Sequence, residues 1–463
     1  MKIKVEKKAN QGSKEKINIK IGKYDSISDI FKSIPDNFWN IGGFVFMMLM
    51  LLILCAEEVY RLFSMTQKYG IFNMSFFFIG AIAEIFAALY IFSQFYKEEK
   101  FSLKKIFKNN VWDILLFAML IWSAISTYTA DNLYVATKGT WYRKDGFYTY
   151  LIYAAMYVCG KAVTSDRFRR YILRTFSTVC TLLSLWVLFQ YNGHIYNMFG
   201  KYAHNMDIWT KYASIFYNTN HYAYFMTLAI MAMVGLIIIE EKVIYKVIFL
   251  AMFVFNLWAL IINDTFGGYI AVMAGIIFAS IIFIIKDRKK IIPVILICLT
   301  FIITSVCVDA KTHILSNDFG VTYGDAKAGI SNDAGGTSRI GLWKQAFRFM
   351  KDRPVFGYGP DGLWSLYYEK GFSSDRPHNE FIQHAVYLGI PAALMYIGAI
   401  LSLFIYCIKR IKKLNVLMLA IGGMVCAYLV SSFFGNTMYY TAPYYFMTLG
   451  MLSACHRKDA QEN

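Results

Sequence analysis

Long apolar stretches alternate with short polar segments along most of the chain. Each stretch approaches the ~20 residues that a helix needs to cross the hydrocarbon core of a bilayer. The lipid core offers no water to the backbone, so each crossing segment must be a helix. Twelve such stretches are present, at residues 38–55, 71–96, 111–129, 147–163, 171–190, 218–239, 243–262, 266–285, 291–308, 381–407, 414–432 and 441–455. The pattern predicts an all-α polytopic membrane protein with about twelve transmembrane helices.

Basic residues are distributed unequally between the two sides of these predicted helices. If the N-terminus is cytoplasmic and the segments alternate, the inner segments hold 30 of the 47 Lys and Arg residues and the outer segments hold 16. Nine of the outer 16 lie in one long loop, where charge does not control insertion. Short cytoplasmic loops carry an excess of Lys and Arg in membrane proteins, so the distribution predicts that both termini are cytoplasmic.

The predicted helices divide the chain into five parts. These are a basic cytoplasmic tail (1–37), helices one to nine (38–308), a large extracytoplasmic loop (309–380), helices ten to twelve (381–455) and a short cytoplasmic tail (456–463). A basic tail beside a membrane is typical of contact with anionic lipid rather than with nucleic acid. Loops as long as the outer one are usually functional or disordered, so any chemistry is expected there.

Composition agrees with this class of protein. The chain is 57% hydrophobic and 17% charged, against about 25% charged residues in soluble domains. The eight cysteines are too dispersed to indicate disulfides or a zinc site. Phosphate loops, nucleophile elbows and dinucleotide fingerprints are absent from any plausible sequence context.

The long outer loop contains two unlike segments. The first, "SNDFGVTYGDAKAGISNDAGG" (316–336), is rich in Gly, Asn and Asp, which predicts an irregular, mobile chain. In the second, "SRIGLWKQAFRFMKDR" (338–353), apolar residues share one half of a helical circumference and polar residues the other. We predict an amphipathic helix that begins after a Thr337 or Ser338 cap and ends before Pro354. Such a helix suits the outer membrane surface.

Arg339 lies near the centre of the apolar half of this predicted helix, in its first turn. A cation in an apolar setting requires a counter-charge, and the free backbone N–H groups of a helix N-terminus favour an anion. An arginine fork beside a helix end therefore fits a phosphate or diphosphate. The alternative is that Arg339 extends to solvent from a frayed helix end.

A glycine turn follows the predicted amphipathic helix. In "PVFGYGP" (354–360), Gly357 and Gly359 flank Tyr358, which predicts a tight turn. This turn is either structural or a place where the backbone closely approaches a ligand.

His378 opens the tenth predicted transmembrane helix. Pro377 suits the first turn of a helix, so His378 is expected at a helix N-terminus on the outer interface. The helix dipole opposes protonation at that position, which keeps the imidazole neutral and able to accept a proton. His384, further along the same helix, is expected to be packed and hydrogen-bonded.

A second basic element precedes the fourth predicted helix. Arg143 and Lys144 follow Trp141 and Tyr142. Aromatic residues with neighbouring cations are common anchors at the membrane interface. The same positive charges are also suited to an anionic ligand, and the sequence leaves both roles open.

The chain from Ser338 to Tyr396 resembles the signature region of the bacterial O-antigen ligase and O-antigen polymerase superfamily. The resemblance rests on "SRIGLWKQAFRFMKDRPVFGYGPDGLW" and "RPHNEFIQHAVYLGIPAALMY". These stretches contain an Arg-led amphipathic helix, a Pro-x-x-Gly-x-Gly turn, and His378–Asn379 opening a helix that continues to Gly-Ile-Pro. Residues 142–146 are similar to an element of many members. The resemblance implies a GT-C-like bundle of about twelve helices.

Members of this superfamily transfer a glycan from an undecaprenyl-diphosphate carrier to an acceptor hydroxyl outside the cytoplasmic membrane, without a metal or other cofactor. The resemblance implies that Arg339 binds the diphosphate and that His378 is the general base. The implied partners are the lipid-linked donor, a glycan, lipid or protein acceptor, and membrane lipid, with no nucleic acid. Tyr358, Gly357, Gly359 and Asn379 are expected to contact the acceptor or glycan, or to form a structural turn. One-step ligation and repeat polymerisation both remain open.

One position departs from the superfamily pattern. Many ligases carry a second arginine where this chain has Phe266, in "NDTFGGY". We hypothesise that Arg143 and Lys144 supply the missing charge to the diphosphate, with Arg376 or Arg348 as substitutes.

Three other functions compete with this interpretation. A lipid-linked oligosaccharide flippase or transporter should show matched halves or paired broken helices at mid-membrane, and no such repeat is apparent. A metal-dependent GT-C glycosyltransferase would use the acidic pair Glu57–Glu58, expected in the first outer loop. A non-catalytic scaffold would not need His378.

Overall fold

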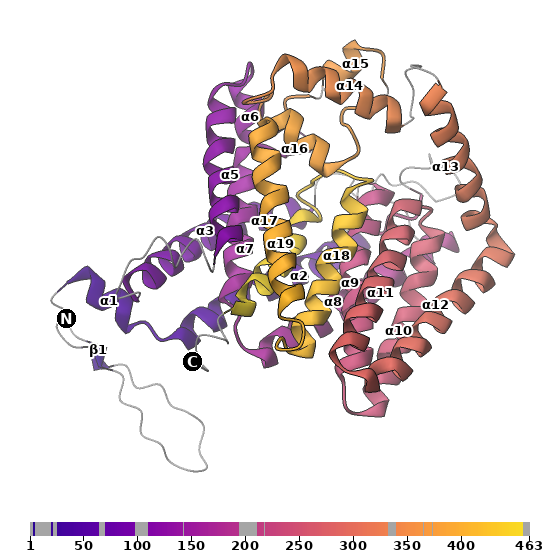
Figure 1. Cartoon of the computed structure of the whole chain (residues 1–463), viewed down its shortest axis with the longest axis horizontal. Helices are drawn as coiled ribbons and strands as arrows, with labels where there is room; N and C mark the ends of the chain where they lie inside the picture. The colour runs from indigo at the N-terminus through magenta and orange to yellow at the C-terminus, as the bar shows by residue number, and fades with distance from the viewer. Residues whose placement is uncertain are drawn as a thin grey trace.

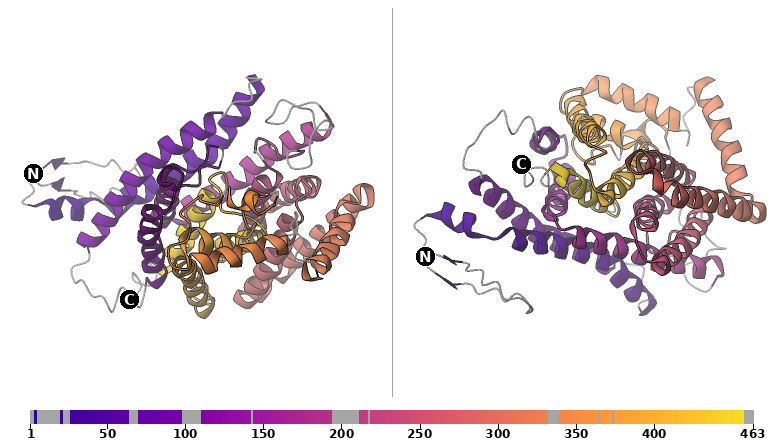
Figure 2. Two further views of the ribbon diagram at one scale, coloured as in Figure 1. Left: turned by 90° about the horizontal axis from the view of Figure 1, so that it is seen from above. Right: turned by 60° about the horizontal axis from the view of Figure 1, so that its bottom comes forward.

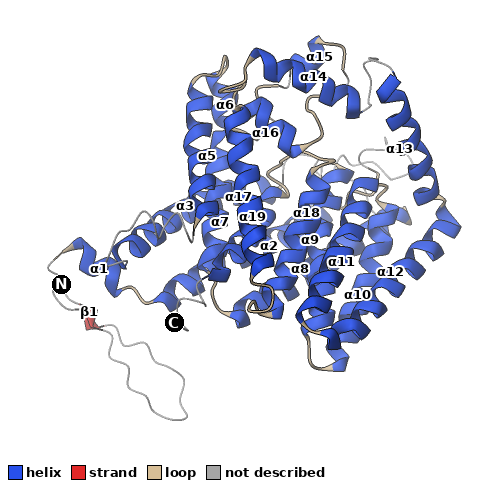
Figure 3. Cartoon of the chain, viewed as in Figure 1, coloured by secondary structure: helices blue, strands red, loops and turns tan. Residues whose placement is uncertain are grey.

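The structure is a computed structural model that describes residues 3–4, 20–21, 26–63, 70–97, 110–141, 143–193, 211–216, 218–331, 339–363, 365–372 and 374–456. Regular structure in these residues is helical (Figure 3), except for a two-residue antiparallel ladder of β1 (Ile3–Lys4) with β2 (Lys20–Ile21). The predicted all-α class is confirmed.

The helices follow one another in three groups. The first group is α1 (Ile27–Ser33), α2 (Asp36–Phe63), α3 (Ile71–Lys97), α5 (Val111–Tyr128), α6 (Leu133–Lys138), α7 (Phe147–Ala162), α8 (Asp166–Tyr191), α9 (Thr219–Ile239), α10 (Val243–Ile262), α11 (Phe266–Lys286) and α12 (Ile291–Thr312). The long loop contributes α13 (Ile314–Ser331), α14 (Arg339–Asp352) and α15 (Leu366–Glu369). The last group is α16 (Glu380–Leu388), α17 (Ile390–Lys409), α18 (Val416–Ser432) and α19 (Ala442–Ser453). Two short 3-10 helices, η3 (Arg288–Lys290) and η4 (Ala454–His456), complete the described elements.

Nine helices among the described residues are long and apolar enough to cross a membrane. They are α2, α3, α5, α8, α9, α10, α11, α12 and α17. The three other predicted spans form shorter apolar helices, α7, α18 and α19, of 16, 17 and 12 residues. Helix α19 is buried along its whole length and packs against α7 and α18. Non-helical backbone is tolerated at membrane depth where protein covers it, so these shorter helices are compatible with a membrane bundle.

Helix α9 forms the centre of the bundle. Nearly all of its residues are buried, and it packs against α8, α10, α11 and α18. A helix that is hydrophobic on all sides is typical of one enclosed by other helices. The helices α1 to α3 lie on one side of the bundle and α13 on the opposite side (Figures 1 and 2). Helices α14 and α15 lie across one end of it (Figure 1).

The tenth predicted span is broken into two helices, contrary to the sequence prediction of one helix over 381–407. Helix α16 ends at Leu388, Gly389 has φ +90°, and α17 begins at Ile390 with Pro391 in its first turn. The glycine turn packs into this break. The backbone N–H groups of Tyr358 and Gly359 donate to the carbonyl oxygens at the end of α16, at 3.1 and 2.8 Å.

The turn thereby satisfies carbonyl groups that a helix end leaves without intrahelical partners. The indole of Trp122 also donates to the carbonyl of Leu388 at 3.1 Å. Apolar positions continue across the break, so periodicity alone gave no sign of it. The break falls at Gly389 and just before Pro391, two local breaker residues, and a segment some thirty residues earlier in the chain bonds to the groups that the break exposes.

Gly357→Ala is expected to lower the thermal unfolding midpoint of the protein. Gly357 has φ +65°, and an added Cβ would lie 2.4 Å from the carbonyl oxygens of Val386 and Tyr387. Left-handed backbone conformations cost non-glycine residues about 1–3 kcal/mol, and the close approach adds to this cost. Scanning fluorimetry of the detergent-solubilised protein measures the shift.

Gly371→Ala is the matched control for this substitution. Gly371 also has a positive φ, of +80°, but an added Cβ would meet nothing within 4 Å. We expect a smaller shift for Gly371→Ala than for Gly357→Ala. Equal shifts would assign the effect to backbone strain alone and remove the packing argument.

The two segments of the long loop are both helical where the structure describes them. The predicted amphipathic helix is confirmed as α14, whereas its Thr337 or Ser338 cap lies outside the described residues. The Gly-, Asn- and Asp-rich segment that was expected to be mobile begins inside a helix, α13 (Ile314–Ser331). This helix follows α12 after a left-handed residue, His313, with φ +56°. It packs against α10, α12 and α14, and these tertiary contacts support a helix that its glycines disfavour.

Candidate active site

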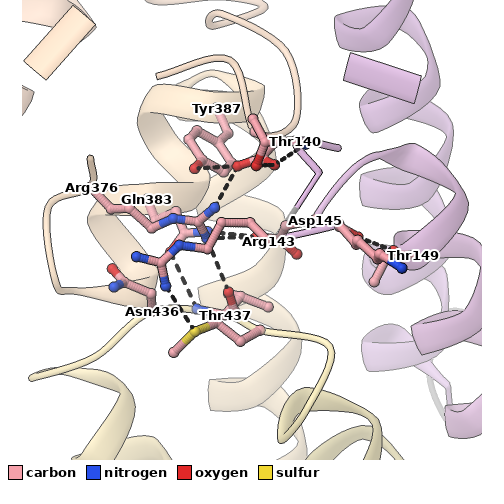
Figure 4. A network of polar contacts seen from close by, with 12 residues as sticks. Thr140, Arg143, Asp145, Thr149, Arg376, Gln383, Tyr387, Asn436 and Thr437 are labelled. Carbon is pink, nitrogen blue, oxygen red and sulfur yellow. Dashed lines mark hydrogen bonds and ion pairs between the residues drawn. The ribbon is translucent and has the colours of Figure 1, made fainter. Parts of the chain in front are cut away.

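Arg376 is the centre of a buried polar network that joins four segments of the chain (Figure 4). Its side chain is fully buried and forms ion pairs with three carboxylates. Asp145 lies at 3.2 Å and Asp375 at 3.3 Å, and Asp361 is in direct contact. A buried arginine is tolerated when paired charges and hydrogen bonds satisfy it. Arg376 therefore ties these four segments together.

The carboxylates of this network have further donors. Asp361 accepts hydrogen bonds from the backbone N–H and the hydroxyl of Thr140, at 2.6 and 2.8 Å. Asp145 accepts from the side-chain amide of Gln383 at 3.0 Å. The loop after α18 joins through Thr437, whose N–H donates to Gln383 at 3.2 Å and whose carbonyl accepts from Arg376 at 3.4 Å.

Charge balance explains how this network is stable inside the protein. It contains two arginines, Arg143 and Arg376, and three aspartates, Asp145, Asp361 and Asp375. Burial raises the pKa of Asp145 to about 8, Asp361 adds to the rise and Arg376 opposes it. A proton on Asp145 at neutral pH leaves two positive and two negative charges.

His378 lies immediately before helix α16 rather than inside its first turn. Asn379 is the N-cap, and its side chain accepts the backbone N–H of Ile382 at 3.0 Å. The prediction that Pro377 starts the helix was therefore wrong. His378 has φ +50°, and its side chain is half-buried.

Both ring nitrogens of His378 have polar neighbours. Nε2 lies 3.0 Å from the hydroxyl of Ser374, and Nδ1 lies 3.4 Å from the side-chain amide of Asn436. Asn436 belongs to the loop between α18 and α19, far from His378 in sequence. The imidazole is thus held between its own loop and another one.

The pKa of His378 is lowered to about 3, first by burial and then by the charge of Arg339. Arg143 and Arg376 act in the same direction, and Asp375 opposes them. The imidazole is therefore neutral at neutral pH. Its neutrality follows from burial and from the charges of nearby arginines, rather than from the helix dipole that the sequence analysis proposed as the cause.

Arg339 is the first residue of α14 and is half-buried. Its guanidinium lies over the ring of Phe434, 5.7 Å from the ring centroid. Its charge acts on His378 and on Asp318 of α13. Burial and the charge of Asp264 raise the pKa of Asp318 to about 6, and the charge of Arg339 opposes this rise. The fold thus brings the helix end that carries Arg339 into the electrostatic neighbourhood of His378.

The four basic residues proposed to replace the missing arginine occupy different environments. Arg143 donates two hydrogen bonds to Asp375, at 3.1 and 2.9 Å, and its charge acts on His378. Lys144 lies over the ring of Phe77, and burial lowers its pKa. Arg348 is exposed on α14, and Arg376 is enclosed by carboxylates. Arg143 is the one of these four that combines partial exposure with an effect on His378, and Tyr142 beside it lies outside the described residues.

Phe266, at the position of the missing arginine, is the first residue of α11 and packs edge-on against Phe319 of α13 at 4.7 Å. This aromatic pair occupies the place from which an arginine would extend.

The glycine turn and Asn379 have structural contacts, which favours the structural alternative for these residues. Gly357 and Gly359 both have positive φ and pack closely against neighbouring chain. The Arg353 guanidinium lies 4.7 Å from the centroid of the Tyr358 ring, and burial raises the pKa of the Tyr358 hydroxyl. Asn379 is buried as the cap of α16.

Several polar residues around His378 and Arg376 were not singled out from the sequence. They are Asp145, Asp361, Ser374, Asp375, Gln383, Asn436 and Thr437. A sequence signal existed for Asp145 and Asp375, because each adjoins a basic residue in an otherwise apolar chain. The loop after α18 contains no charged residue and gave no signal.

The acidic pair Glu57–Glu58 lies within α2, not in the first outer loop as expected. One carboxylate oxygen of Glu57 accepts from Arg61 at 2.6 Å, and the other accepts the backbone N–H of Phe72 at 3.0 Å. Both oxygens of Glu57 are thus engaged within the protein, which disfavours a role for the pair in catalysis.

One comparison with known protein families bears on these residues. Residues 251–397 match the family described as O-antigen ligase. The match runs from α10 into α17 and includes Arg339, the glycine turn and His378. No curated protein matches the chain in sequence. Together with the apolar helices among the described residues, the match supports a bacterial membrane protein that is similar, over residues 251–397, to the O-antigen ligase family.

Proposed function

We propose that this protein transfers a glycan from undecaprenyl diphosphate to an acceptor hydroxyl on the outer face of the cytoplasmic membrane, without a metal ion. The observation that supports this most directly is that Arg339 and His378 are electrostatic neighbours at one end of the bundle. A neutral imidazole suits proton abstraction, and an arginine at a helix N-terminus suits a diphosphate. Both residues lie in the segment that matches the O-antigen ligase family.

The proposed reaction is a single displacement. His378 accepts the proton of the acceptor hydroxyl as the acceptor oxygen forms a bond to the anomeric carbon. The bond from that carbon to the diphosphate oxygen breaks, and the lipid diphosphate leaves with the bonding electrons. Arg339 stabilises the charge that develops on the leaving group, which is usually the larger electrostatic contribution in such transfers.

Arg143 is the second proposed diphosphate ligand. Asp375 accepts hydrogen bonds from both Arg143 and Arg376. Arg143 can therefore exchange a bond for a phosphate oxygen while Asp375 keeps Arg376 as a partner. We assign Arg376 to holding the loops, because its full burial among carboxylates leaves it no access to substrate.

The electrostatic setting of His378 supports activation by the donor. Three arginines disfavour the imidazolium in the free protein, so His378 starts as a weak base. A bound diphosphate adds negative charge beside the same arginines and favours the imidazolium. The imidazole then becomes a stronger base when the donor is in place.

This reasoning predicts different pH profiles for kcat and kcat/KM. The acid limb of kcat/KM reports the pKa of the base in the free protein, and the acid limb of kcat reports its pKa in the donor complex. Because the diphosphate raises the pKa of His378, the acid limb of kcat should lie at higher pH than that of kcat/KM. Initial rates from about pH 4 to 9 with a defined donor locate the acid limb of kcat, and kcat/KM should stay level over that range because its own limb is expected near pH 3. Acid limbs in the reverse order would contradict the proposed activation.

Transfer by the purified protein in lipid nanodiscs tests the proposed function. The donor is a defined undecaprenyl-diphosphate oligosaccharide, EDTA is present, and candidate acceptor glycans and lipids are supplied. We expect release of lipid diphosphate together with a glycosylated acceptor. Movement of the intact donor across the bilayer would instead identify a transporter, and activity that returns only with a divalent cation would exclude the metal-independent mechanism.

A further inference from the structure

The loop between α18 and α19, Phe433–Thr441, contributes a polar side chain to His378 from outside the segment that matches the family. Asn436 in this loop is 2% exposed. Its Nδ2 lies 3.4 Å from Nδ1 of His378, and its Oδ1 is buried without a hydrogen-bond partner among the described residues. A buried amide oxygen without a donor is costly, so this arrangement calls for a partner.

A rotation of the Asn436 amide by 180° brings Oδ1 to Nδ1 of His378 and places Nδ2 in the buried position that Oδ1 leaves. The oxygen and nitrogen of an asparagine amide are distinguished by the hydrogen bonds they make. With Oδ1 facing the ring, the Nδ1–H group of a neutral imidazole donates to it. Nε2 is then the unprotonated nitrogen, 3.0 Å from Oγ of Ser374. To donate to Nε2, the Ser374 hydroxyl turns away from the carbonyl of Arg376, which accepts it at 3.2 Å.

The buried network holds Asn436 in this position. The next residue, Thr437, is bonded to Gln383 and to Arg376. Arg143 contacts the sulfur of Met438 at 3.4 Å. The loop therefore cannot move relative to His378 without breaking contacts to residues on two other segments.

We propose that Asn436 is a positioning residue that holds His378 in the Nδ1–H tautomer, so that Nε2 is the atom that accepts the proton of the acceptor hydroxyl. The other ring nitrogen of a histidine commonly sets the tautomer in this way. The hydroxyl of Ser374 then marks the place at which an acceptor hydroxyl donates to Nε2. The catalytic consequence rests on the proposed glycan transfer, but the tautomer itself does not.

The tautomer is measured directly by solid-state ¹⁵N NMR of histidine-labelled protein in lipid. The chain has 7 histidines, and the signal lost in His378→Asn identifies the ring of interest. We expect a neutral ring protonated at Nδ1 in the wild type and a loss of this preference in Asn436→Ala. A wild-type ring protonated at Nε2, or a tautomer that Asn436→Ala leaves unchanged, would overturn the inference.

Kinetics of Asn436→Ala and Asn436→Asp separate positioning from a merely structural role. Asn436→Ala should lower kcat roughly 100-fold, as misplaced catalytic groups commonly do, with little change in the KM for the donor. Asn436→Asp retains an acceptor for Nδ1–H and places a carboxylate beside the ring, which favours the imidazolium. The acid limb of the pH–rate profile of Asn436→Asp should therefore move to higher pH. At pH values above that limb, Asn436→Asp should have a higher kcat than Asn436→Ala.

The other charged and titratable groups that face His378 are unchanged in these variants. They are Arg339 of α14, Arg143 of the loop before α7, Asp375 and Arg376 of its own loop, and His221 of α9. Asn192→Ala, at the exposed end of α8, is the matched control and should behave as the wild type. If both Asn436 variants lose the same activity at every pH and share a lowered unfolding midpoint, the loop is structural and the positioning role is wrong.

The two readouts also separate this inference from the proposed function. If the tautomer behaves as expected but the wild type transfers no glycan, the function is wrong and the positioning stands. If the wild type transfers glycan but the tautomer does not depend on Asn436, the positioning is wrong and the function stands.

Discussion

His378→Asn should lower kcat for glycan transfer by about 10²–10⁴-fold, the usual contribution of a general base. The KM for the donor should change little, because the imidazole acts on the acceptor hydroxyl rather than on the diphosphate. Asparagine is the informative replacement at this position. His378 has φ +50°, and asparagine tolerates left-handed backbone conformations better than other side chains except glycine.

His378→Ala would combine the loss of the base with backbone strain of about 1–2 kcal/mol. Comparing the two variants therefore separates catalysis from folding. His313→Asn is the matched control, since His313 is an exposed histidine that also has a positive φ, of +56°. It should retain wild-type activity. Wild-type kcat in His378→Asn would exclude a general-base role for His378.

Arg339→Ala should lower kcat/KM for the lipid-linked donor by about 10²–10³-fold, the size of effect seen when one preorganised electrostatic donor is removed. The KM for the donor should rise because the arginine binds the diphosphate in the ground state, and kcat should fall because the arginine stabilises the charge of the leaving diphosphate. Arg339→Lys keeps the charge but loses the planar fork, so its activity should lie between those of Arg339→Ala and the wild type.

Arg339→Ala should also alter the pH dependence of the reaction. Removing a positive charge near His378 favours the imidazolium, so the pKa of His378 rises from about 3 and the acid limb of kcat/KM moves to higher pH. Lys351→Ala, on the exposed face of the last turn of α14, is the control for charge loss on the same helix. An Arg339→Ala variant with wild-type kcat/KM and an unshifted acid limb would separate Arg339 from the reaction.

Features that depend on neighbouring residues in the chain were predictable. Apolar length defined the spanning segments, because the energetic requirement of the bilayer core acts on each segment alone. The amphipathic pattern and Pro354 predicted α14, since helix periodicity and proline geometry are local properties. Arg339 and His378 were recognisable as candidate site residues from the local sequence, because charged and titratable groups are rare beside apolar segments.

Features that depend on distant segments were not predictable. The break at Gly389 is stabilised by the packing of residues 354–359 against the end of α16, and the apolar pattern runs through it unchanged. The helical state of α13 follows from its contacts with α10, α12 and α14, which outweigh its glycine-rich composition.

The roles of Arg143, of Arg376 and of the loop between α18 and α19 also depended on the tertiary structure. The sequence offered Arg143 as a diphosphate ligand with Arg376 as a substitute. The fold encloses Arg376 among three carboxylates and leaves Arg143 partly exposed, with its charge acting on His378. The uncharged loop that carries Asn436 became relevant only because it folds against His378. Local patterns specified which residues were capable of chemistry, because residue type and periodicity are local. Long-range pairing of buried charges selected which of them meet, because the energies of ion pairs and hydrogen bonds depend on distances in space.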